Sequence, residues 1–298
     1  MKKVLLLFSV NCFFILLLIS GIFYACSKGS ESKPFNTFAE DFSTRIIGMA
    51  FDNEDKMYVG TVENQAQKSI LQITPGGEIS TLVSIECLAI EYIKVGKDDS
   101  IYVAVIVDDT EGGAKILKIT RDAKISLFSD GFTQPVGMAF DLENNMLVVD
   151  AMAKKIYKIS PSKEKSVFID LGNITGAKSG NYYHGIDFDH DCRNLYVAGL
   201  NTNGNGNLVI FPIKTDGNPD MPVILSDHYT KHVTIHLDVV YATIDSRGLL
   251  IIDADGTQKL MNDPLLNDGM NLCFGSKEFG ENTLYVNTFD KIVKMTVK

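Results

Sequence analysis

Three residues of the chain combine side-chain types that support acid–base or metal chemistry: Glu91, His184 and Asp238. Two carboxylates and one imidazole can hold a borderline metal ion such as zinc or manganese. The same three groups can act as general base and general acid in the hydrolysis of a lactone or an ester. The alternative is structural, with His184 a hydrogen-bonded loop histidine and Asp238 an acid that stabilises a turn. The choice depends on whether the fold brings the three together.

Each of these residues lies close to the start of a predicted strand. Glu91 and His184 directly precede the strands that begin at residues 92 and 185. Asp238 lies two residues before Val240, and residues two apart on a strand face the same way. We therefore expect Glu91, His184 and Asp238 to converge where these strands meet. His236 and Tyr183 are the expected neighbours of that point: each is close in sequence to one of the three.

Other polar residues are weaker candidates. Histidines recur every fourth residue at 228, 232 and 236, which on a helix would form a metal-binding face. The β-branched run at residues 233–235 favours a strand instead. Two acids that each follow a strand are expected to cap turns rather than to catalyse: Asp150 and Asp253.

The elements that position these residues repeat along the chain. An apolar strand, a polar turn and a second strand ending in a pattern close to Tyr-Val recur six times, in residues 48–59, 92–103, 137–148, 185–197, 241–251 and 271–286. Successive copies are 44, 45, 48, 56 and 30 residues apart when aligned on Asp52, Gly96, Asp141, Asp189, Asp245 and Gly275. Alternating apolar residues and turns rich in Gly, Asn and Asp are typical of strands. Six four-stranded units of this period predict an all-β fold, a six-bladed β-propeller.

The two ends of this region predict how the ring closes. The last unit ends with a third strand at residues 292–295 and has no fourth strand after it. Residues 35–42 have the pattern of an outer strand and precede the first unit. Supplying the missing strand from the N-terminal side removes an exposed edge. We therefore expect one propeller over residues 35–298, closed by an N-terminal outer strand and monomeric, because a closed ring has no free edge to pair.

Two phrases resemble those of a known superfamily. Residues 135–141 (PVGMAFD) resemble the Pro-x-Gly phrase of NHL-repeat and SMP-30/gluconolactonase-like propellers. Residues 271–275 and 282–286 (NLCFG and NTLYV) are similar to the last-blade phrase of the gluconolactonase family. The resemblance covers about residues 35–298. It implies a lactonase or esterase-type hydrolase with one divalent metal, usually calcium, held at the mouth of the central channel by carboxylate and amide oxygens.

The residues at the channel mouth depart from the family pattern. The family's ligands stand just before the residue that opens each inner strand, and here those positions hold Ile47, Glu91, Val136, His184, Val240 and Met270. Four of the six are apolar and cannot ligate calcium. The sequence therefore predicts a propeller that binds a small ligand or a protein at this mouth, with the usual metal ligands lost. The alternative is a divergent metal-dependent hydrolase that uses calcium or zinc on Glu91, His184 and Asp238.

The first residues resemble a bacterial lipoprotein signal. A cationic start at residues 1–3 is followed by an apolar run over residues 4–24 and then by Ala25 and Cys26. We expect residues 1–25 to be removed, Cys26 to be lipidated and residues 26–34 to form a tether. The propeller would then be held at a membrane outside the cytoplasm, in the bacterial cell envelope. An uncleaved anchor is the alternative, because 21 residues can span a bilayer.

Charge and cysteine content exclude several classes of protein. The net charge of −9 offers no basic surface for phosphate, so we expect no nucleic-acid partner. An apolar content of 45% with 22% charged residues is typical of a folded domain rather than a disordered chain. Beyond residue 26 the cysteines are odd in number and scattered, at positions 87, 192 and 273, which predicts free thiols rather than a disulfide framework.

Overall fold

The computed structural model describes residues 35–62, 67–173, 182–200, 206–214, 216–226, 228–244 and 248–297. The chain divides into residues 1–34 and residues 35–298, and all of the described residues belong to the second unit. Cys26, with the predicted signal and tether, lies outside the described residues. Within the described ranges there is no helix of the length and apolar character that crossing a membrane requires.

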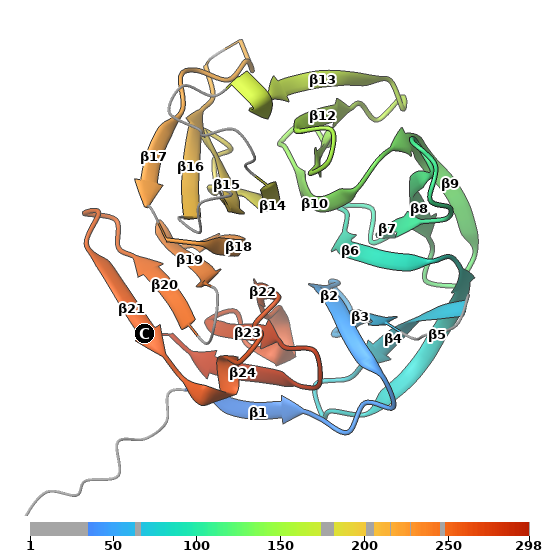
Figure 1. Ribbon diagram of the computed structural model, residues 1–298. Helices are drawn as coiled ribbons and strands as arrows, with labels where there is room; N and C mark the ends of the chain where they lie inside the picture. Colours follow the sequence, from blue (N-terminus) through green and yellow to red (C-terminus); the bar gives the residue numbers. More distant parts are fainter. Residues whose placement is uncertain are drawn as a thin grey trace, which may run out of the picture. The chain divides into compact units, whose positions relative to one another are not determined.

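Six four-stranded antiparallel sheets stand side by side in a ring (Figure 1), and we call the space along the central axis, between the inner strands, the channel. The inner strands are β2 (Arg45–Phe51), β6 (Ala89–Val95), β10 (Pro135–Phe140), β14 (Tyr182–Phe188), β18 (Thr230–His236) and β22 (Asn271–Phe274). The second strands are β3 (Met57–Val62), β7 (Ile101–Ile106), β11 (Met146–Asp150), β15 (Asn194–Leu200), β19 (Val239–Ile244) and β23 (Thr283–Asn287). The six-bladed propeller predicted from the repeat is therefore confirmed.

The outer half of each blade contains two more strands. The third strands are β4 (Gln67–Ile73), β8 (Ala114–Ile119), β12 (Lys155–Ile159), β16 (Gly206–Pro212), β20 (Gly248–Ile252) and β24 (Ile292–Thr296). The outer strands are β5 (Ile79–Glu86), β9 (Ile125–Phe132), β13 (Lys165–Asp170), β17 (Val223–Ser226), β21 (Gln258–Asn262) and β1 (Asn36–Ala39). Three short 3-10 helices complete the described elements: η1 (Leu171–Asn173), η2 (Pro264–Leu266) and η3 (Lys277–Phe279).

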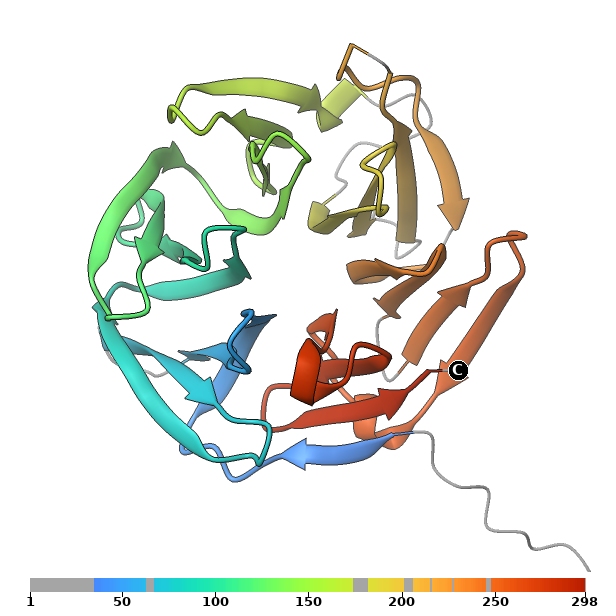
Figure 2. The same ribbon diagram turned by 180° about the vertical axis from the view of Figure 1, so that it is seen from behind.

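The N-terminal strand closes the ring as the sequence predicts. β1 pairs antiparallel with β24, with Asn36 opposite Lys294 and Thr37 opposite Val293. Seen from the opposite side, β1 again lies along the outer edge of the sixth blade (Figure 2). Phe35, just before β1, is buried against the strands of that blade. The first and last segments of the propeller thus form one sheet, in which β1 covers the edge that β24 would otherwise expose.

Every inner strand runs in the same sense, which gives the propeller two distinct faces. We call the face where the inner strands begin the upper face, and the face where they end the lower face. Apolar side chains fill the spaces between adjacent blades in six clusters. The second strands are the most deeply buried elements because blades cover them on both sides.

The recurring glycine of the repeat marks the closest approach between inner strands. A Cβ atom on Gly137 would lie 2.2 Å from the carbonyl oxygen of His184 on the next inner strand. A Cβ atom on Gly185 would lie 2.7 Å from the Cα atom of His232 on the strand after that. Both contacts are shorter than packed atoms allow, so only glycine permits this spacing. The tight ring of inner strands keeps the channel narrow.

The recurring aspartate at the end of the same phrase fixes the turn on the lower face. Asp52 Oδ1 accepts hydrogen bonds from the backbone N–H groups of Glu54 and Lys56, at 2.8 and 3.0 Å. Asp141 and Asp189 accept equivalent backbone hydrogen bonds in blades three and four. The carboxylates of these aspartates stabilise the turns, which is the usual role of Asp in such turns.

Candidate functional site

The structure separates the three residues that the sequence predicts to converge. Glu91 and His184 lie near the starts of β6 and β14, at the upper face. Asp238 lies in the β18–β19 turn, beyond the end of a seven-residue strand, at the lower face. Seven residues of strand span about 20 Å. Asp238 therefore cannot act with Glu91 and His184, and the predicted arrangement of the three is wrong.

The error comes from the register of blade five. Its inner strand is β18, whereas the sequence pattern placed it at residues 241–245, which belong to the second strand β19. Val240 is consequently buried between blades with Ala242 and Leu250, and is not at the channel mouth. The turn between the two strands is only two residues long, with Leu237 and Asp238 at φ 50° and 62°. This two-residue turn contains neither glycine nor asparagine, the residues that usually indicate a tight hairpin in a sequence.

The other predicted channel-mouth residues divide between the two faces. Ile47, Val136 and Tyr183 lie on the upper halves of their inner strands, and Met270 directly precedes β22. The side chains of Val136 and Tyr183 pack between blades three and four, and that of Ile47 packs between blades one and two, so these three do not line the channel mouth as predicted. His236 instead ends β18 at the lower face. Its Nε2 atom is 2.9 Å from Asn282 Oδ1, and its ring stacks on Phe274 with the centroids 4.1 Å apart.

The structure also shows the roles of the weaker candidates, which are the recurring histidines and the two acids that follow strands. His232 and His236 both lie on β18, so the strand favoured by the β-branched run is confirmed and the helical metal face is wrong. Asp150 accepts hydrogen bonds from the backbone N–H groups of Thr133, Gln134 and Ala153, which confirms its capping role. In the turn that contains Asp253, the side chain that caps is that of Asp255, which accepts from the N–H of Thr257.

His232 occupies the position that the sequence assigned to Val240. It is buried, and its ring stacks on that of Tyr92, with the centroids 5.5 Å apart and the planes at 15°. Tyr92 belongs to blade two and His232 to blade five, so the stacked pair bridges the channel from opposite sides of the ring. The sequence offers one clue to His232: it stands directly before the apolar run of β18, as His184 stands before that of β14.

Burial shifts the pKa of each ionisable group at the upper end of the channel toward its uncharged form. Together with nearby His184 and Lys231, burial lowers the pKa of His232 to about 3. Burial likewise lowers the pKa of His184 to about 4, with a contribution from Lys231. The pKa of Glu91 is raised, again by burial. Near neutral pH both imidazoles are therefore neutral and present one hydrogen-bond donor and one acceptor each.

Three polar atoms at this end of the channel are buried without a hydrogen-bond partner among the described residues. They are Nδ1 of His232 and both Nδ2 and Oδ1 of Asn271. Asn271 is the first residue of β22, and its carboxamide interacts with the Tyr92 hydroxyl closely enough to oppose the rise that burial causes in the pKa of Tyr92, but without the geometry of a full hydrogen bond. Leaving such an atom unpaired costs about 1–3 kcal/mol. A polar molecule in the channel would satisfy these atoms, so the cluster of Glu91, His184, His232 and Asn271 has the composition of a hydrogen-bonding site.

A calcium ion of the gluconolactonase type does not fit these residues. Ile47, Val136 and Met270 stand at three of the six ligand positions and have no oxygen in the side chain. Among the described residues, no group of three or more His, Cys, Asp or Glu side chains is placed to hold a metal ion. The chemistry available here is therefore that of the protein's own side chains.

The lower half of the channel encloses a separate cavity of about 300 Å³. Five of the six inner strands contribute to its wall. Lys94 Nζ is 3.5 Å from Asp187 Oδ1, and the Thr234 hydroxyl donates to Asp187 Oδ2 at 2.9 Å. Burial opposes the charge on Lys94, but Asp187, Tyr92 and Cys273 together outweigh it, so the pKa of Lys94 is raised. Burial also raises the pKa of the Cys273 thiol to about 12. The cavity therefore holds a charged pair beside a neutral thiol.

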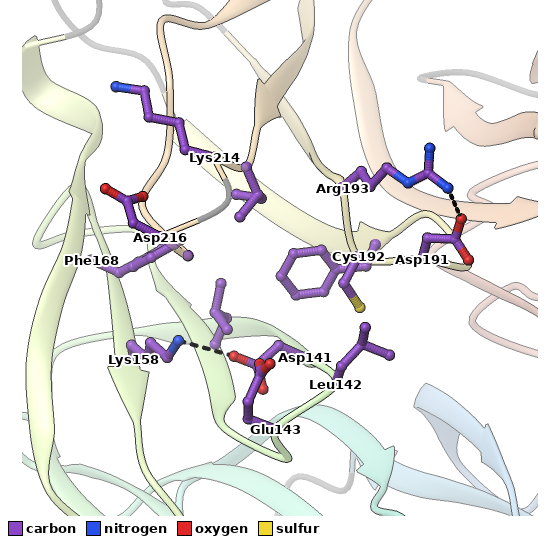
Figure 3. Close-up of a pocket in the computed structure, with 14 residues that line it drawn as sticks. Asp141, Leu142, Glu143, Lys158, Phe168, Asp191, Cys192, Arg193, Lys214 and Asp216 are labelled. Carbon is purple, nitrogen blue, oxygen red and sulfur yellow. Dashed lines mark hydrogen bonds and ion pairs between the residues drawn. The ribbon is translucent and has the colours of Figure 1, made fainter.

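Two larger clefts open on the lower face. One of about 610 Å³ lies between blades three and four, where Lys158 Nζ pairs with Asp141 Oδ2 at 3.0 Å and Arg193 pairs with Asp191 (Figure 3). The other, of about 660 Å³, lies between blades four and five and includes His236 and Asp238 in its wall. Four of the charged side chains in the first cleft form these two pairs, whereas Glu143, Lys214 and Asp216 also line it and are not paired with one another.

The fold has many structural relatives, although no family model and no curated protein matches the sequence. A gluconolactonase from Xanthomonas campestris superimposes with a TM-score of 0.71 at 12% identity, covering 91% of this chain and 93% of that one. In fold, the domain is a propeller of the gluconolactonase type.

Two further structures share this propeller. Virginiamycin B lyase from Staphylococcus aureus has a TM-score of 0.61 at 14% identity and covers 89% of this chain and 99% of that one. An auxiliary nutrient binding protein from Bacteroides thetaiotaomicron has a TM-score of 0.65 at 12% identity and covers 85% of this chain and 69% of that one. At these identities the likeness establishes the architecture and leaves the chemistry to the site itself.

Proposed function

We propose that this gluconolactonase-type propeller is a binding protein of the cell envelope that holds a small polar molecule at the upper end of its channel. The proposal rests on one observation: the three buried polar atoms of His232 and Asn271 that lack hydrogen-bond partners among the described residues. Buried polar atoms are almost always paired in folded proteins. A ligand that pairs with them gains those hydrogen bonds without breaking others inside the protein.

The electrostatics at this end of the channel favour an uncharged ligand. The imidazoles of His184 and His232 are neutral near pH 7 because burial lowers both of their pKa values. Recognition would then depend on hydrogen-bond geometry rather than on charge. Sites built this way strongly reject analogues that lack a required hydroxyl or amide.

The N-terminal segment supports a place for this binding outside the cytoplasm. A cationic start, an apolar run and Ala25 before Cys26 resemble the signal of a bacterial lipoprotein. Lipidation of Cys26 would attach the propeller to a membrane, with residues 26–34 as the tether. Labelling cells with a fatty-acid analogue should mark the wild-type protein and not the Cys26→Ser variant. Equal labelling of both would exclude this anchor.

A direct test of binding measures thermal melting of the full chain, purified in detergent, against a panel of uncharged sugars, polyols, amides and lactones. A bound compound should raise the melting temperature of the wild type. His232→Phe, which keeps a ring against Tyr92 but removes Nδ1, and Asn271→Leu should both lose the shift. His190→Phe, at an exposed histidine on the lower face, is the control and should keep it. A shift that survives both channel variants would place the ligand elsewhere.

Hydrolysis of lactones or esters is the second candidate. The observation in its favour is that Glu91, with a raised pKa, and His184 share the upper end of the channel, where a carboxyl group and an imidazole can exchange protons with a ligand. Release of acid from the lactones of the same panel would support it. Activity that requires added calcium would contradict the absence of a fitting metal site, and no acid release would leave binding as the function.

A further inference from the structure

The lower cavity of the channel is a second potential site, and it is set apart from the polar cluster above. The Tyr92–His232 stack bridges the channel between the two, and Tyr92 forms part of the wall of the lower cavity. The rest of that wall includes inner-strand residues and the turn residues Asn53 and Ser276, which lie at the lower face. The cavity therefore lies at the lower end of the channel, away from the cluster of Glu91, His184 and Asn271.

The Lys94–Asp187 pair inside this cavity retains hydrogen-bonding capacity. The Nζ–Oδ1 distance of 3.5 Å is longer than the 2.7–2.9 Å of a strong charge-assisted hydrogen bond. An ammonium group has three donors, and among the described residues Asp187 is the one partner placed within ion-pair distance of Lys94. Both side chains also keep accessible surface, 30% for Lys94 and 22% for Asp187, although inner strands surround them. A ligand in the cavity can therefore reach both charges.

The charges that face this cavity balance, and this restricts the charge of a ligand. Asp52, the other acid in the wall, is occupied by the turn N–H groups and by the Tyr58 hydroxyl, which donates to Oδ2 at 2.8 Å. The groups left to meet a ligand are therefore one cation and one anion. A ligand with a net charge would leave that charge uncompensated between the inner strands, where solvent reaches it only in part, and this is unfavourable. A ligand that has both charges would leave none.

We propose that the lower cavity binds a small zwitterion, an α-amino acid with an apolar side chain. Its carboxylate would accept from Lys94 Nζ and its ammonium would donate to Asp187 Oδ1. The bond lengths of the amino-acid backbone place its nitrogen and a carboxylate oxygen about 3 Å apart. That spacing is close to the 3.5 Å between the two protein atoms, so the four charged groups can alternate in sign around a compact ring.

The remaining wall of the cavity suits the side chain of such a ligand. Phe51, Val95 and Phe274 contribute apolar surface on the lower side of the Lys94–Asp187 pair. A volume of about 300 Å³ is at the small end of ligand pockets, which excludes large molecules. This inference does not rest on the function proposed for the upper end of the channel, because it uses other residues.

The experiment is isothermal titration of the full chain in detergent with leucine and with two analogues that each lack one charge, 4-methylpentanoate and isoamylamine. Leucine should bind, and each analogue should bind at least about tenfold more weakly, a loss of about 1.4 kcal/mol. No leucine binding up to about 10 mM, or equal binding by either analogue, would overturn the proposal.

Variants locate the binding in the lower cavity. Lys94→Met and Asp187→Asn should each weaken leucine binding at least about tenfold. His232→Phe and Asn271→Leu, at the upper end, should leave leucine binding unchanged. The two proposals can therefore fail independently: one variant pair tests the lower cavity and the other tests the upper end of the channel. If a single variant does not fold because it leaves one charge unpaired, the double variant Lys94→Met/Asp187→Leu removes both. Unchanged leucine binding by a folded variant of either kind would refute the site.

Discussion

The ring of His232 lies parallel to the ring of Tyr92, 5.5 Å between centroids, although the two residues come from blades on opposite sides of the propeller. Few contacts within the propeller join blades that are not neighbours. This one divides the channel into an upper end with unpaired polar atoms and a lower cavity with an ion pair. The stack also explains why His232 stays neutral: its nitrogens lie in a space where an extra proton would gain little solvation.

Acid should destabilise the protein through its buried histidines. The pKa of His232 is about 3 in the folded protein against 6.5 in an unfolded chain, so below pH 6.5 the unfolded state binds a proton that the folded state does not. The stability that is complete above pH 6.5 is then lost as the pH falls toward 3, at about 1.4 kcal/mol per pH unit. His184 adds a similar loss between pH 6.5 and about 4.

The His232→Phe variant isolates this effect. Glu91 works in the opposite direction, because a carboxyl group with a raised pKa takes up its proton earlier in the folded state and gains stability as the pH falls. The comparison of variant and wild type removes that contribution. Urea unfolding at about pH 7 and pH 5 should show a smaller loss for His232→Phe, by roughly 2 kcal/mol. Equal losses would mean that His232 is protonated in the folded protein.

Replacing Gly137 by alanine should disrupt the inner ring. The new Cβ would meet the His184 carbonyl oxygen at 2.2 Å, and both atoms belong to backbones that neighbouring blades hold in place. Overpacking of this kind costs about 3 kcal/mol or more. Gly76→Ala is the matched control, because its Cβ would lie 3.7 Å from the nearest atom, in a turn of the lower face. Denaturant midpoints that fall equally for both variants would contradict this account of the repeat.

The sequence predicts the fold well because the constraints that build it are local and repeat. Glycines such as Gly137 recur where inner strands approach, and aspartates such as Asp52 and Asp141 recur where the next turn must be capped. Each signal lies within a few residues of the element it forms. Six copies then reinforce one another, so an error in one blade leaves the ring intact.

The site is predicted less well because it depends on register across blades. In blade five the inner strand β18 and the second strand β19 are both rich in β-branched and apolar residues, and the two-residue turn between them gives no glycine signal. Because the sequence pattern assigns the second strand of blade five as its inner strand, it predicts Asp238 at the channel mouth and does not predict His232 there. The Tyr92–His232 stack joins residues 140 positions apart, and no local pattern indicates such a contact.

Closure of the ring by the N-terminal strand should contribute a large share of stability. Phe35 is almost fully buried against Leu284 and Val293 of blade six, although it precedes the first blade. Truncating a buried phenylalanine to alanine costs about 3–5 kcal/mol. Phe35→Ala should therefore lower the melting temperature by many degrees, whereas Asn36→Ala, at the exposed neighbour, should change it little. Matching melting temperatures would show that β1 is dispensable for closure.

The turn aspartates should prove structural when they are removed. In Asp52→Ala the N–H groups of Glu54 and Lys56 and the buried Tyr58 hydroxyl all lose their acceptor. With about 1–3 kcal/mol for each buried group left unpaired, and solvent reaching part of the turn, we expect a total loss of about 3 kcal/mol.

Asp253→Ala is the control for that measurement, because Asp255 caps its turn, and its stability should stay within about 0.5 kcal/mol of the wild type. Ligand binding at either end of the channel should survive in Asp52→Ala at temperatures where the variant is folded, since Asp52 offers no free oxygen to the cavity. A variant that is stable but loses leucine binding would instead make Asp52 part of the lower site and change the charge balance from which that site was inferred.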